Sequence, residues 1–269
     1  MAGNDVLAVV SGASSGIGLA LSEGLLARGA RVLAIARGAE GLAAARASLP
    51  PEARARFLPL PADVREAAAL EAAIATALTE HGPPGWCIAC AGIVLPGRFL
   101  DLAAEDHAAQ WATNYQGAVN LLRACLPTMR RARRGRVVLV SSAAALGSFY
   151  GYSGYAPGKA ALRALGDILH LELGLSGITV TTAFPPDTDT PQLREERARR
   201  PRVAELFLRS NRVFAPQHVA RLILEGAERG RRHVTPGLGV ALLHRLPWLI
   251  QPGLHRAQRR LMERYEPRD

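Results

Sequence analysis

The sequence of 269 residues is poor in cysteine, in aromatic residues and in lysine. Three cysteines are too few for a small secreted scaffold held together by disulfide bonds. The chain contains no stretch of about 18 uncharged apolar residues, so no membrane-spanning helix is expected. The N-terminus has no basic segment and only a short apolar run at residues 6–10, so we expect no signal peptide and a cytoplasmic protein.

The cysteine pattern does not indicate a metal site either. Cys87 and Cys90 form a C-x-x-C, but no second Cys or His pair follows at zinc-site spacing. Both cysteines lie in an apolar run, so we expect buried thiols, with a redox or metal role as the alternative, and predict no metal. Hydrophobic residues make up 49% of the chain, which is enough for a sizeable core and excludes a disordered or fibrous protein.

Positive charge is concentrated at the C-terminal end. Residues 1–193 carry 16 basic and 15 acidic side chains, whereas residues 194–269 carry 17 basic and 8 acidic ones. The overall net charge of +10 therefore belongs mostly to the last part of the chain. No recognition motif or aromatic platform accompanies it, so nucleic acid is not predicted as a partner. Lys159 is the single lysine, which suggests a position where arginine cannot replace it.

Apolar runs alternate with helical patterns along most of the chain. The runs are nearly continuous, as in strands buried on both faces, and the alternation predicts a single-domain α/β fold of Rossmann type. We expect a doubly wound parallel sheet with helices on both faces, a catalytic domain at 1–236 with a lid at about 188–214, and a basic amphipathic tail at 237–269. The predicted strands are 6–10, 31–36, 57–60, 86–91, 136–141 and 178–183, and the predicted helices are 18–28, 40–48, 65–80, 104–131, 153–174 and 216–230.

A glycine-rich loop joins the first strand to the first helix. Its pattern is G-x-x-x-G-x-G, which permits a tight turn and close approach of the backbone to a phosphate at a helix N-terminus. A plain glycine turn is the alternative, but the position between strand and helix favours a dinucleotide site. The predicted cofactor residues of the loop are Gly12, Ser14, Ser15, Gly16, Ile17 and Gly18.

The end of the second strand indicates which dinucleotide binds. A carboxylate there would accept hydrogen bonds from the ribose 2′-hydroxyl of NAD, but this chain has Arg37 instead. Arg37 can pair with a 2′-phosphate, with Ser14 as a helper, so we predict NADPH/NADP⁺ as cofactor. The alternative is an ordinary surface arginine in an arginine-rich chain.

Tyr155 and Lys159 form a Y-x-x-x-K pair whose members share one face of a helix. We expect the lysine ammonium to lower the pKa of the phenol, which could then protonate an alkoxide formed by hydride transfer to a ketone. Ser142 ends the fifth predicted strand and could hydrogen-bond the carbonyl oxygen. Asn114, in the long predicted helix, could anchor a water relay to the lysine. These four are the predicted catalytic residues.

With these motifs in this order, the chain resembles the short-chain dehydrogenase/reductase family over about residues 5–235. The resemblance implies that Asp63 and Val64 contact adenine, that Ala91 and Gly92 line the cofactor site, and that protons pass through Tyr155, the ribose, Lys159 and a water on Asn114. It also implies a homo-dimer or homo-tetramer. The sequence departs from the family pattern at two places. Ala89-Cys90-Ala91-Gly92 replaces the usual N-N-A-G, so an asparagine that braces the sheet is missing. Pro157 lies between the tyrosine and the lysine, where it is tolerable in a first helical turn.

The segment at residues 185–191, P-P-D-T-D-T-P, is similar to that of the subfamily acting on 3-ketodihydrosphingosine. The resemblance implies NADPH-dependent reduction of this long-chain keto-lipid to a secondary alcohol in sphingolipid synthesis, with Pro185, Thr188 and Thr190 near the nicotinamide. Alternatives are a 3-oxoacyl thioester or hydroxysteroid-type reductase, or a non-catalytic NADP-sensing protein. Asp187 or Asp189 could attract the substrate ammonium or cap a turn. Candidate alkyl contacts, which could equally pack the lid on the core, are Leu206, Phe207, Leu208, Val213 and Phe214.

The tail combines an apolar segment at 238–250, including Trp248, with a basic flank at 255–260. This combination is typical of a segment that lies on an anionic membrane, and predicts peripheral contact at the cytoplasmic face. A dimer contact and a tail folded over its own core are the alternatives.

Overall fold

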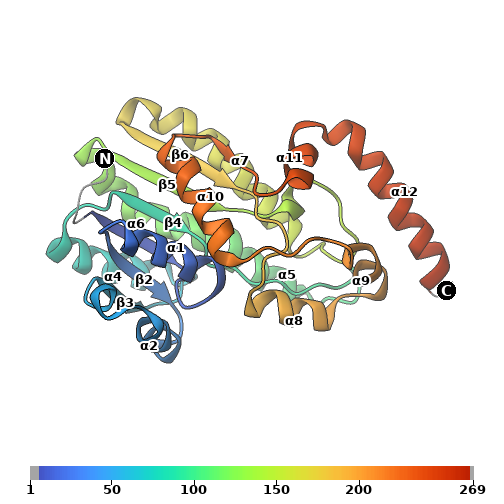
Figure 1. The fold of residues 1–269 in the computed structure, drawn as a ribbon, viewed down its shortest axis with the longest axis horizontal. Coiled ribbons are helices and arrows are strands. Elements are labelled where there is room, and N and C mark those ends of the chain that lie inside the picture. The colour runs from blue at the N-terminus through green and yellow to red at the C-terminus, as the bar shows by residue number, and fades with distance from the viewer. Residues whose placement is uncertain (1–5, 267–269) are drawn as a thin grey trace.

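A computed structural model describes residues 6–266 and shows one seven-stranded sheet with helices on both faces (Figure 1). The strand order is β3-β2-β1-β4-β5-β6-β7, and every pairing is parallel. The predicted doubly wound fold is therefore confirmed. The strands are β1 (Leu7–Ser11), β2 (Arg31–Ala36), β3 (Phe57–Pro61), β4 (Trp86–Ala89), β5 (Gly135–Val140), β6 (Ile178–Ala183) and β7 (His233–Val234).

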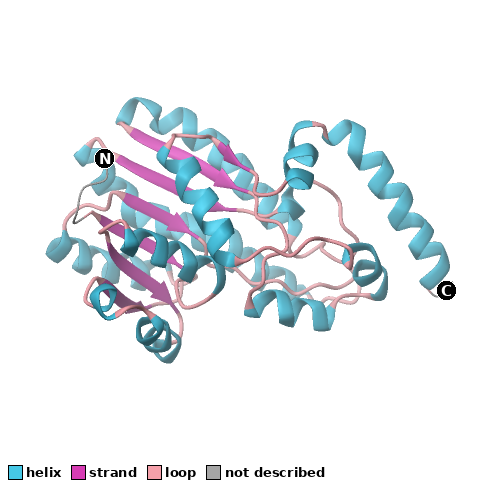
Figure 2. Ribbon diagram, viewed as in Figure 1, coloured by secondary structure: helices cyan, strands magenta, loops and turns pink. Residues whose placement is uncertain are grey.

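The two faces of the sheet bury two separate cores. Along β1, Ala8 and Val10 belong to one core and Leu7 and Val9 to the other, which is the alternation that a strand with two covered faces requires. The first core is covered by α1 (Gly16–Ala27), α2 (Ala39–Ser48), α3 (Pro51–Arg54) and α10 (Pro216–Glu228). The second is covered by α4 (Ala67–His81), α6 (Gly117–Ala132) and α7 (Ala156–Leu173) (Figure 2).

The chain reverses its direction of strand addition between β1 and β4. In a parallel sheet this switch point opens a crevice at the carboxyl ends of the strands, where ligands bind. The loops that follow β1, β2, β4, β5 and β6 all leave the sheet at this edge.

The predicted strands and helices match the observed ones within two to three residues at most ends. One predicted helix, 104–131, is divided into α5 (Ala104–Trp111), a π-helical turn η1 (Ala112–Gln116) and α6. Short 3-10 turns occur at η2 (Ala143–Ala145) and η3 (Gly174–Ser176). Elements that the periodicity did not predict are β7, α3, α8 (Pro191–Arg199), α9 (Arg202–Leu208), α11 (Leu238–Arg245) and α12 (Pro247–Tyr265).

The tail is folded over its own core on one side. Val240 and Leu243 of α11 pack in a cluster with Leu146 and Phe184, and Gln258 of α12 is buried. The Gln258 amide accepts from the Tyr150 backbone N–H at 2.8 Å and donates to the Ser148 carbonyl at 3.0 Å. Within residues 6–266, no helix is both long enough and apolar enough to span a bilayer.

Candidate functional site

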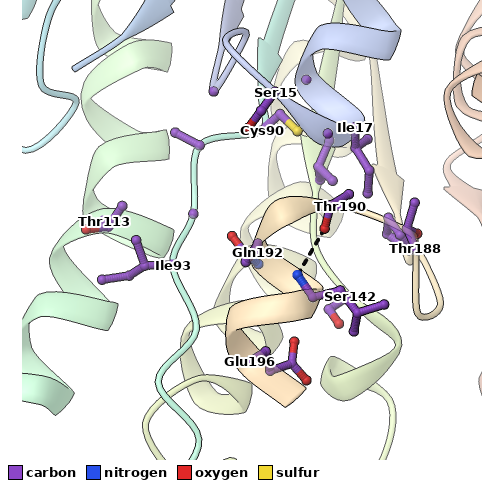
Figure 3. Close-up of a pocket in the computed structure, with 18 of the residues that line it drawn as sticks. Ser15, Ile17, Cys90, Ile93, Thr113, Ser142, Thr188, Thr190, Gln192 and Glu196 are labelled. Atoms are coloured by element: carbon purple, nitrogen blue, oxygen red, sulfur yellow. Dashed lines mark hydrogen bonds between the residues drawn. The ribbon is translucent and has the colours of Figure 1, made fainter. Parts of the chain in front are cut away.

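A cleft of about 710 Å³ opens at the carboxyl edge of the sheet. It is large enough for a dinucleotide together with part of a substrate. Figure 3 shows its two sides: the glycine loop and the end of β4 on one, and the segment from Thr188 to Glu196 on the other. Every predicted site residue except Asn114 lines it, namely Gly12, Ser14, Ser15, Gly16, Ile17, Gly18, Arg37, Asp63, Val64, Ala91, Gly92, Ser142, Tyr155, Lys159, Pro185, Thr188 and Thr190.

The glycine loop needs glycine for both conformation and space. Gly12 has a φ of 71° and Gly16 a φ of 56°, values that residues with side chains rarely adopt. A Cβ atom on Gly18 would lie 2.1 Å from the Gly12 carbonyl oxygen, and one on Gly12 would lie 2.9 Å from the Ala91 backbone. The loop therefore packs against itself and against the end of β4, and the N-terminus of α1 faces the cleft, as a pyrophosphate site requires.

Arg37 and Asp63 line the cleft at the ends of β2 and β3, where the sequence predicts the adenosine part of a cofactor. Arg37 is exposed, and within the described residues it takes part in no salt bridge. The Asp63 carboxylate is held by the Arg65 guanidinium at 2.6 Å and accepts from the Arg65 backbone N–H at 2.9 Å, which lowers the pKa of Asp63. Arg37 is thus available for a phosphate, whereas Asp63 is already oriented by a partner.

Ser142, Tyr155 and Lys159 come together at the other end of the cleft, where β5 meets the start of α7. Tyr155 is the residue that precedes the first turn of α7, and Pro157 lies inside that turn, as expected. The Lys159 ammonium lies 5.7 Å from the centre of the Tyr155 ring and donates to the Val140 carbonyl at 3.0 Å. The Ser141 hydroxyl, which donates to the Lys159 carbonyl at 2.7 Å, ties α7 to β5.

The expected lowering of the Tyr155 pKa is wrong for the structure as it stands. Burial of the phenol raises its pKa, and the Ser142 hydroxyl offsets only part of this effect. Nearby carboxylates, Glu196 and Asp187, raise the pKa further. Burial also lowers the pKa of Lys159 to about 8, because its ammonium has lost most of its water. The ammonium still carries its charge at pH 7, but this charge does not outweigh the effect of burial on the phenol.

Asn114 lies in the π-helical turn, behind the cleft rather than in its lining. Its side-chain oxygen accepts from the Ile93 backbone N–H at 2.8 Å, and its amide nitrogen donates to the Ile93 carbonyl at 2.9 Å. A Cβ built on Gly92 would lie 3.0 Å from the Asn114 oxygen and 3.3 Å from the Lys159 nitrogen, so both groups border Gly92. Asn114 thus fixes the segment after β4 beside the lysine.

Although the asparagine that braces the sheet is absent, the Ser11 side chain joins the ends of two neighbouring strands. Its hydroxyl accepts from the backbone N–H groups of Cys90 and Ala91 at 3.1 and 3.2 Å, and donates to the Ile88 carbonyl at 3.4 Å. The ends of β1 and β4 are therefore joined at the floor of the cleft. Cys87 is fully buried as expected, but Cys90 lines the cleft, and burial raises the pKa of its thiol to about 11.

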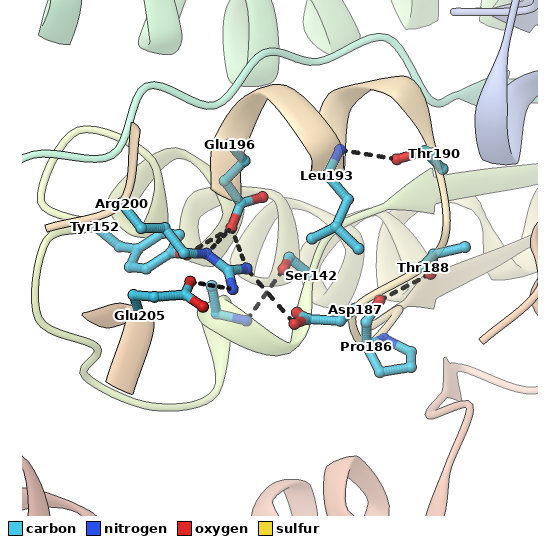
Figure 4. Close-up of polar contacts among 11 residues, drawn as sticks. Ser142, Tyr152, Pro186, Asp187, Thr188, Thr190, Leu193, Glu196, Arg200 and Glu205 are labelled. Atoms are coloured by element: carbon cyan, nitrogen blue, oxygen red, sulfur yellow. Dashed lines mark hydrogen bonds and ion pairs between the residues drawn. The ribbon is translucent and has the colours of Figure 1, made fainter. Parts of the chain in front are cut away.

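The segment after β6 closes the cleft. The Thr188 hydroxyl donates to the Pro186 carbonyl at 2.8 Å, and the Thr190 hydroxyl caps α8 by accepting from the Leu193 N–H at 3.1 Å (Figure 4). Asp189 is exposed and paired with Arg194, whereas Asp187 lines the cleft. Of the five candidate alkyl contacts, Leu208 alone is in the lining.

Several residues of the lining were not predicted. They are polar residues of the lid, Gln192, Glu196 and Asn211, and the aromatic residues Phe149 and Tyr152 that precede α7. Glu196 and Gln192 lie on α8, a helix with no apolar periodicity, so no sequence signal distinguished them from a solvated surface.

Comparison with known proteins agrees with this geometry. The model of the family described as short chain dehydrogenase matches residues 6–201. A zebrafish (Danio rerio) protein named 3-dehydrosphinganine reductase is 33% identical over 231 residues, 84% of this chain and 70% of its own. A bovine (Bos taurus) 3-ketodihydrosphingosine reductase is 34% identical over 226 residues, 82% of this chain and 68% of its own.

Solved structures show the same fold. Levodione reductase superposes with a TM-score of 0.79 at 23% identity, covering 88% of this chain and 98% of that one. A short chain dehydrogenase from Mycobacterium paratuberculosis bound to NAD gives a TM-score of 0.75 at 20% identity, covering 87% of this chain and 97% of its own. At these identities the likeness concerns the fold alone.

Proposed function

The chain belongs to the short-chain dehydrogenase family, and we propose that it reduces the 3-keto group of 3-ketodihydrosphingosine to a secondary alcohol with NADPH. The observation that carries the reaction type is the meeting of Ser142, Tyr155 and Lys159 at one end of a dinucleotide-sized cleft. The names of the relatives, which match most of the chain, support the substrate. We assign catalysis to residues 1–236, with the lid at 188–214.

The residues of the cleft fit an NADP cofactor. The glycine loop leaves backbone N–H groups at the N-terminus of α1 for the pyrophosphate, and Arg37 with Ser14 suits a 2′-phosphate. Asp63, Val64, Ala91 and Gly92 border the adenosine half, and Pro185, Thr188 and Thr190 border the nicotinamide half. When bound, this cofactor supplies a hydride for the carbonyl carbon.

The protein's own residues handle the proton. We assign Ser142 to hydrogen-bond the substrate carbonyl oxygen, and Tyr155 to give its phenolic proton to that oxygen as negative charge develops. Because burial raises the pKa of Tyr155, the phenol holds its proton at neutral pH and serves as an acid in the reducing direction. Lys159, beside Gly92 and Asn114, lies where a proton returning to Tyr155 can enter.

The apolar part of the cleft suits an alkyl chain. Leu193 and Leu208 line it from the lid, Phe149 from the segment before α7, and Ile93 from the segment after β4. Burial of methylene groups against them contributes about 0.8 kcal/mol each. A long-chain ketone therefore gains affinity over a short one.

A substrate panel tests this function. Full-length protein with NADPH and 3-ketodihydrosphingosine should show falling absorbance of reduced cofactor. Tyr155→Phe should lower the rate roughly 100- to 10,000-fold while NADPH still binds, because it removes the general acid. Tyr115→Phe, which removes a hydroxyl outside the cleft lining, is the matched control. Turnover of 3-oxoacyl thioesters alone would point to another reductase, and cofactor binding without turnover of any ketone would support an NADP-sensing protein.

We further propose that the tail at 237–269 places the enzyme, as a cytoplasmic homo-oligomer, on an anionic membrane that holds the lipid substrate. α11 and the start of α12 expose Leu238, Leu242, Trp248 and Leu249, with Trp248 at 72% and Leu249 at 58% exposed. Arg245, Arg256, Arg259, Arg260 and Arg264 are exposed on the same two helices. Apolar and basic side chains together suit the interface of an anionic bilayer. Phe149 belongs both to the cleft lining and to the cluster beneath the tail, so the two sites adjoin.

Vesicle flotation tests the tail. Deleting it would uncover Phe184 and its neighbours, so a double variant, Trp248→Ser with Leu249→Ser, is cleaner. We expect wild-type protein to float with vesicles rich in phosphatidylserine and the variant to remain behind. Leu175→Ser is the control, because Leu175 is 93% exposed at the opposite end of the sheet, before β6. Equal flotation of all three proteins would overturn the membrane proposal.

A further inference from the structure

A buried ionic cluster forms the wall of the cleft opposite the glycine loop (Figure 4). At its centre is Arg200, whose side chain is 1% exposed. The guanidinium contacts a Glu196 carboxylate oxygen at 2.6 Å, Asp187 at 3.5 Å and Glu205 at 3.9 Å. The Tyr152 hydroxyl donates to the same oxygen of Glu196. Glu196, Asp187 and Tyr152 line the cleft, whereas Arg200 lies behind them.

The cluster contains more negative than positive charge. Three carboxylates share one guanidinium, and in the described part of the chain none of the three pairs with another cation. The side chains of Asp187 and Glu196 are only 19% and 13% exposed, whereas that of Glu205 is 40% exposed. Burial of uncompensated carboxylates is unfavourable, so one more cation in the cleft would stabilise Asp187 and Glu196.

The hydrogen bonds of the cluster are incomplete as well. All the bonds to Glu196 reach its Oε1 atom, and among residues 6–266 no donor reaches Oε2. Arg200 Nη1 and Glu205 Oε2 are buried without any hydrogen bond. These two atoms lie 3.9 Å from each other behind the cleft lining, where a water can complete the network. The acceptor that remains for a ligand in the cleft is Glu196 Oε2.

We propose that Glu196, assisted by Asp187, binds the ammonium group that stands next to the keto carbon of the substrate, and so selects amino ketones over neutral ketones. This inference rests on the proposed function. It requires an ammonium close to the reacting carbonyl. Ser142, Asp187 and Glu196 line the same cleft, and the segments that carry Ser142 and Asp187 are joined by a hydrogen bond from the Ala143 N–H to the Pro185 carbonyl at 2.9 Å (Figure 4). Asp189, the other candidate at the sequence level, is paired with Arg194 and lies outside the lining.

The same charges connect recognition to catalysis. Glu196 and Asp187 both raise the pKa of Tyr155, so they hold the proton on the phenol more tightly. A substrate ammonium bound between them would cancel part of this effect and ease proton transfer to the carbonyl oxygen. A neutral ketone would leave the effect in place. Selectivity should therefore appear in kcat as well as in KM.

The test compares a shortened, soluble homologue of 3-ketodihydrosphingosine with the same ketone lacking its amine. We expect wild-type protein to favour the amino ketone in kcat/KM, and Glu196→Gln to lower this preference roughly 10- to 100-fold, the range for one charge-assisted hydrogen bond. Asp187→Asn should lower it too, and it leaves α8 unchanged. Glu195→Gln, the adjacent exposed residue of α8, is the matched control and should keep the wild-type preference.

A second readout does not depend on turnover. Calorimetry should detect binding of the shortened amino-alcohol product to wild-type protein and Glu195→Gln, and a loss of about tenfold or more in affinity in Glu196→Gln. An equal loss of activity on both ketones, or an unchanged preference, would overturn the inference and leave Glu196 as a positioning residue for Arg200 and the lid. Failure of wild-type protein to reduce either ketone would instead overturn the proposed function.

Discussion

Replacing Lys159, whose ammonium is buried, by an uncharged residue should stabilise the cofactor-free protein at neutral pH. Lys159 is 4% exposed, and burial lowers its pKa from 10.5 to about 8. At pH 7 the unfolded chain and the folded protein both carry the charge, but the folded protein carries it in a poorly solvated place. Lys159→Met keeps the length of the side chain and removes the charge.

The magnitude follows from the pKa difference. One pKa unit corresponds to 1.36 kcal/mol, so a fall from 10.5 to about 8 amounts to about 3 kcal/mol at pH 7. The lost hydrogen bond to the Val140 carbonyl offsets about 1 kcal/mol of this gain. We therefore expect Lys159→Met to raise the free energy of unfolding by about 2 kcal/mol at pH 7, although it inactivates the enzyme.

The pH dependence identifies the cause. Between about pH 8 and pH 10.5 the unfolded chain binds more protons at this lysine than the folded protein does, so wild-type stability rises with pH over that window. The gain in unfolding free energy from Lys159→Met should therefore be about 2 to 3 kcal/mol smaller at pH 10 than at pH 7. Other titrating groups affect both proteins equally, so they cancel when the variant is compared with wild type. Urea unfolding of both proteins at the two pH values measures it. A difference that does not change with pH would refute the reasoning.

Two further variants test the cofactor site. In fluorescence titrations, Arg37→Asp should weaken the binding of NADPH roughly 10- to 100-fold and leave the binding of NADH almost unchanged. Arg123→Asp, at an exposed position of α6, serves as the control. Equal effects on both cofactors would contradict a 2′-phosphate contact. Gly18→Ala should abolish binding of either cofactor, because the new methyl group would lie 2.1 Å from the Gly12 carbonyl oxygen. Gly239→Ala, where nothing lies within 4 Å, should bind normally, and intact binding by Gly18→Ala would show that the loop can relax.

The sheet was predictable because its sequence signal is local. Five of the strands are runs largely buried on both faces, and the edge strand β3 still has an apolar sequence. The glycine loop, Tyr155 and Lys159 have fixed spacings that can be found in the sequence. β7 has only two residues, which is too short for a periodic signal. The π-helical turn at Asn114 was read as continuous helix, because an extra residue in a turn does not change composition.

The wall of the cleft was not predictable because it depends on tertiary pairing. The residues of α8 alternate in charge like those of an exposed helix, and only the fold shows that Arg200 is buried between Glu196 and Asp187. The predicted direction of the Tyr155 pKa shift was wrong because this shift also depends on tertiary structure. Spacing places an ammonium near the phenol, but the desolvation that dominates comes from residues distant in sequence.

The single lysine of the chain can now be explained by its surroundings. In a chain where nearly every basic residue is arginine, position 159 is buried, borders Gly92 and Asn114, and has one backbone carbonyl as hydrogen-bond acceptor. A guanidinium has five donors and stays charged at any pH the protein meets, so arginine would leave several buried donors unpaired and could not release a proton. An ammonium with a pKa of about 8 needs fewer partners and exchanges its proton near neutral pH. Position 159 therefore requires a cation that is small enough to be buried and that can release its proton. Of the basic side chains that are charged at pH 7, only lysine has both properties.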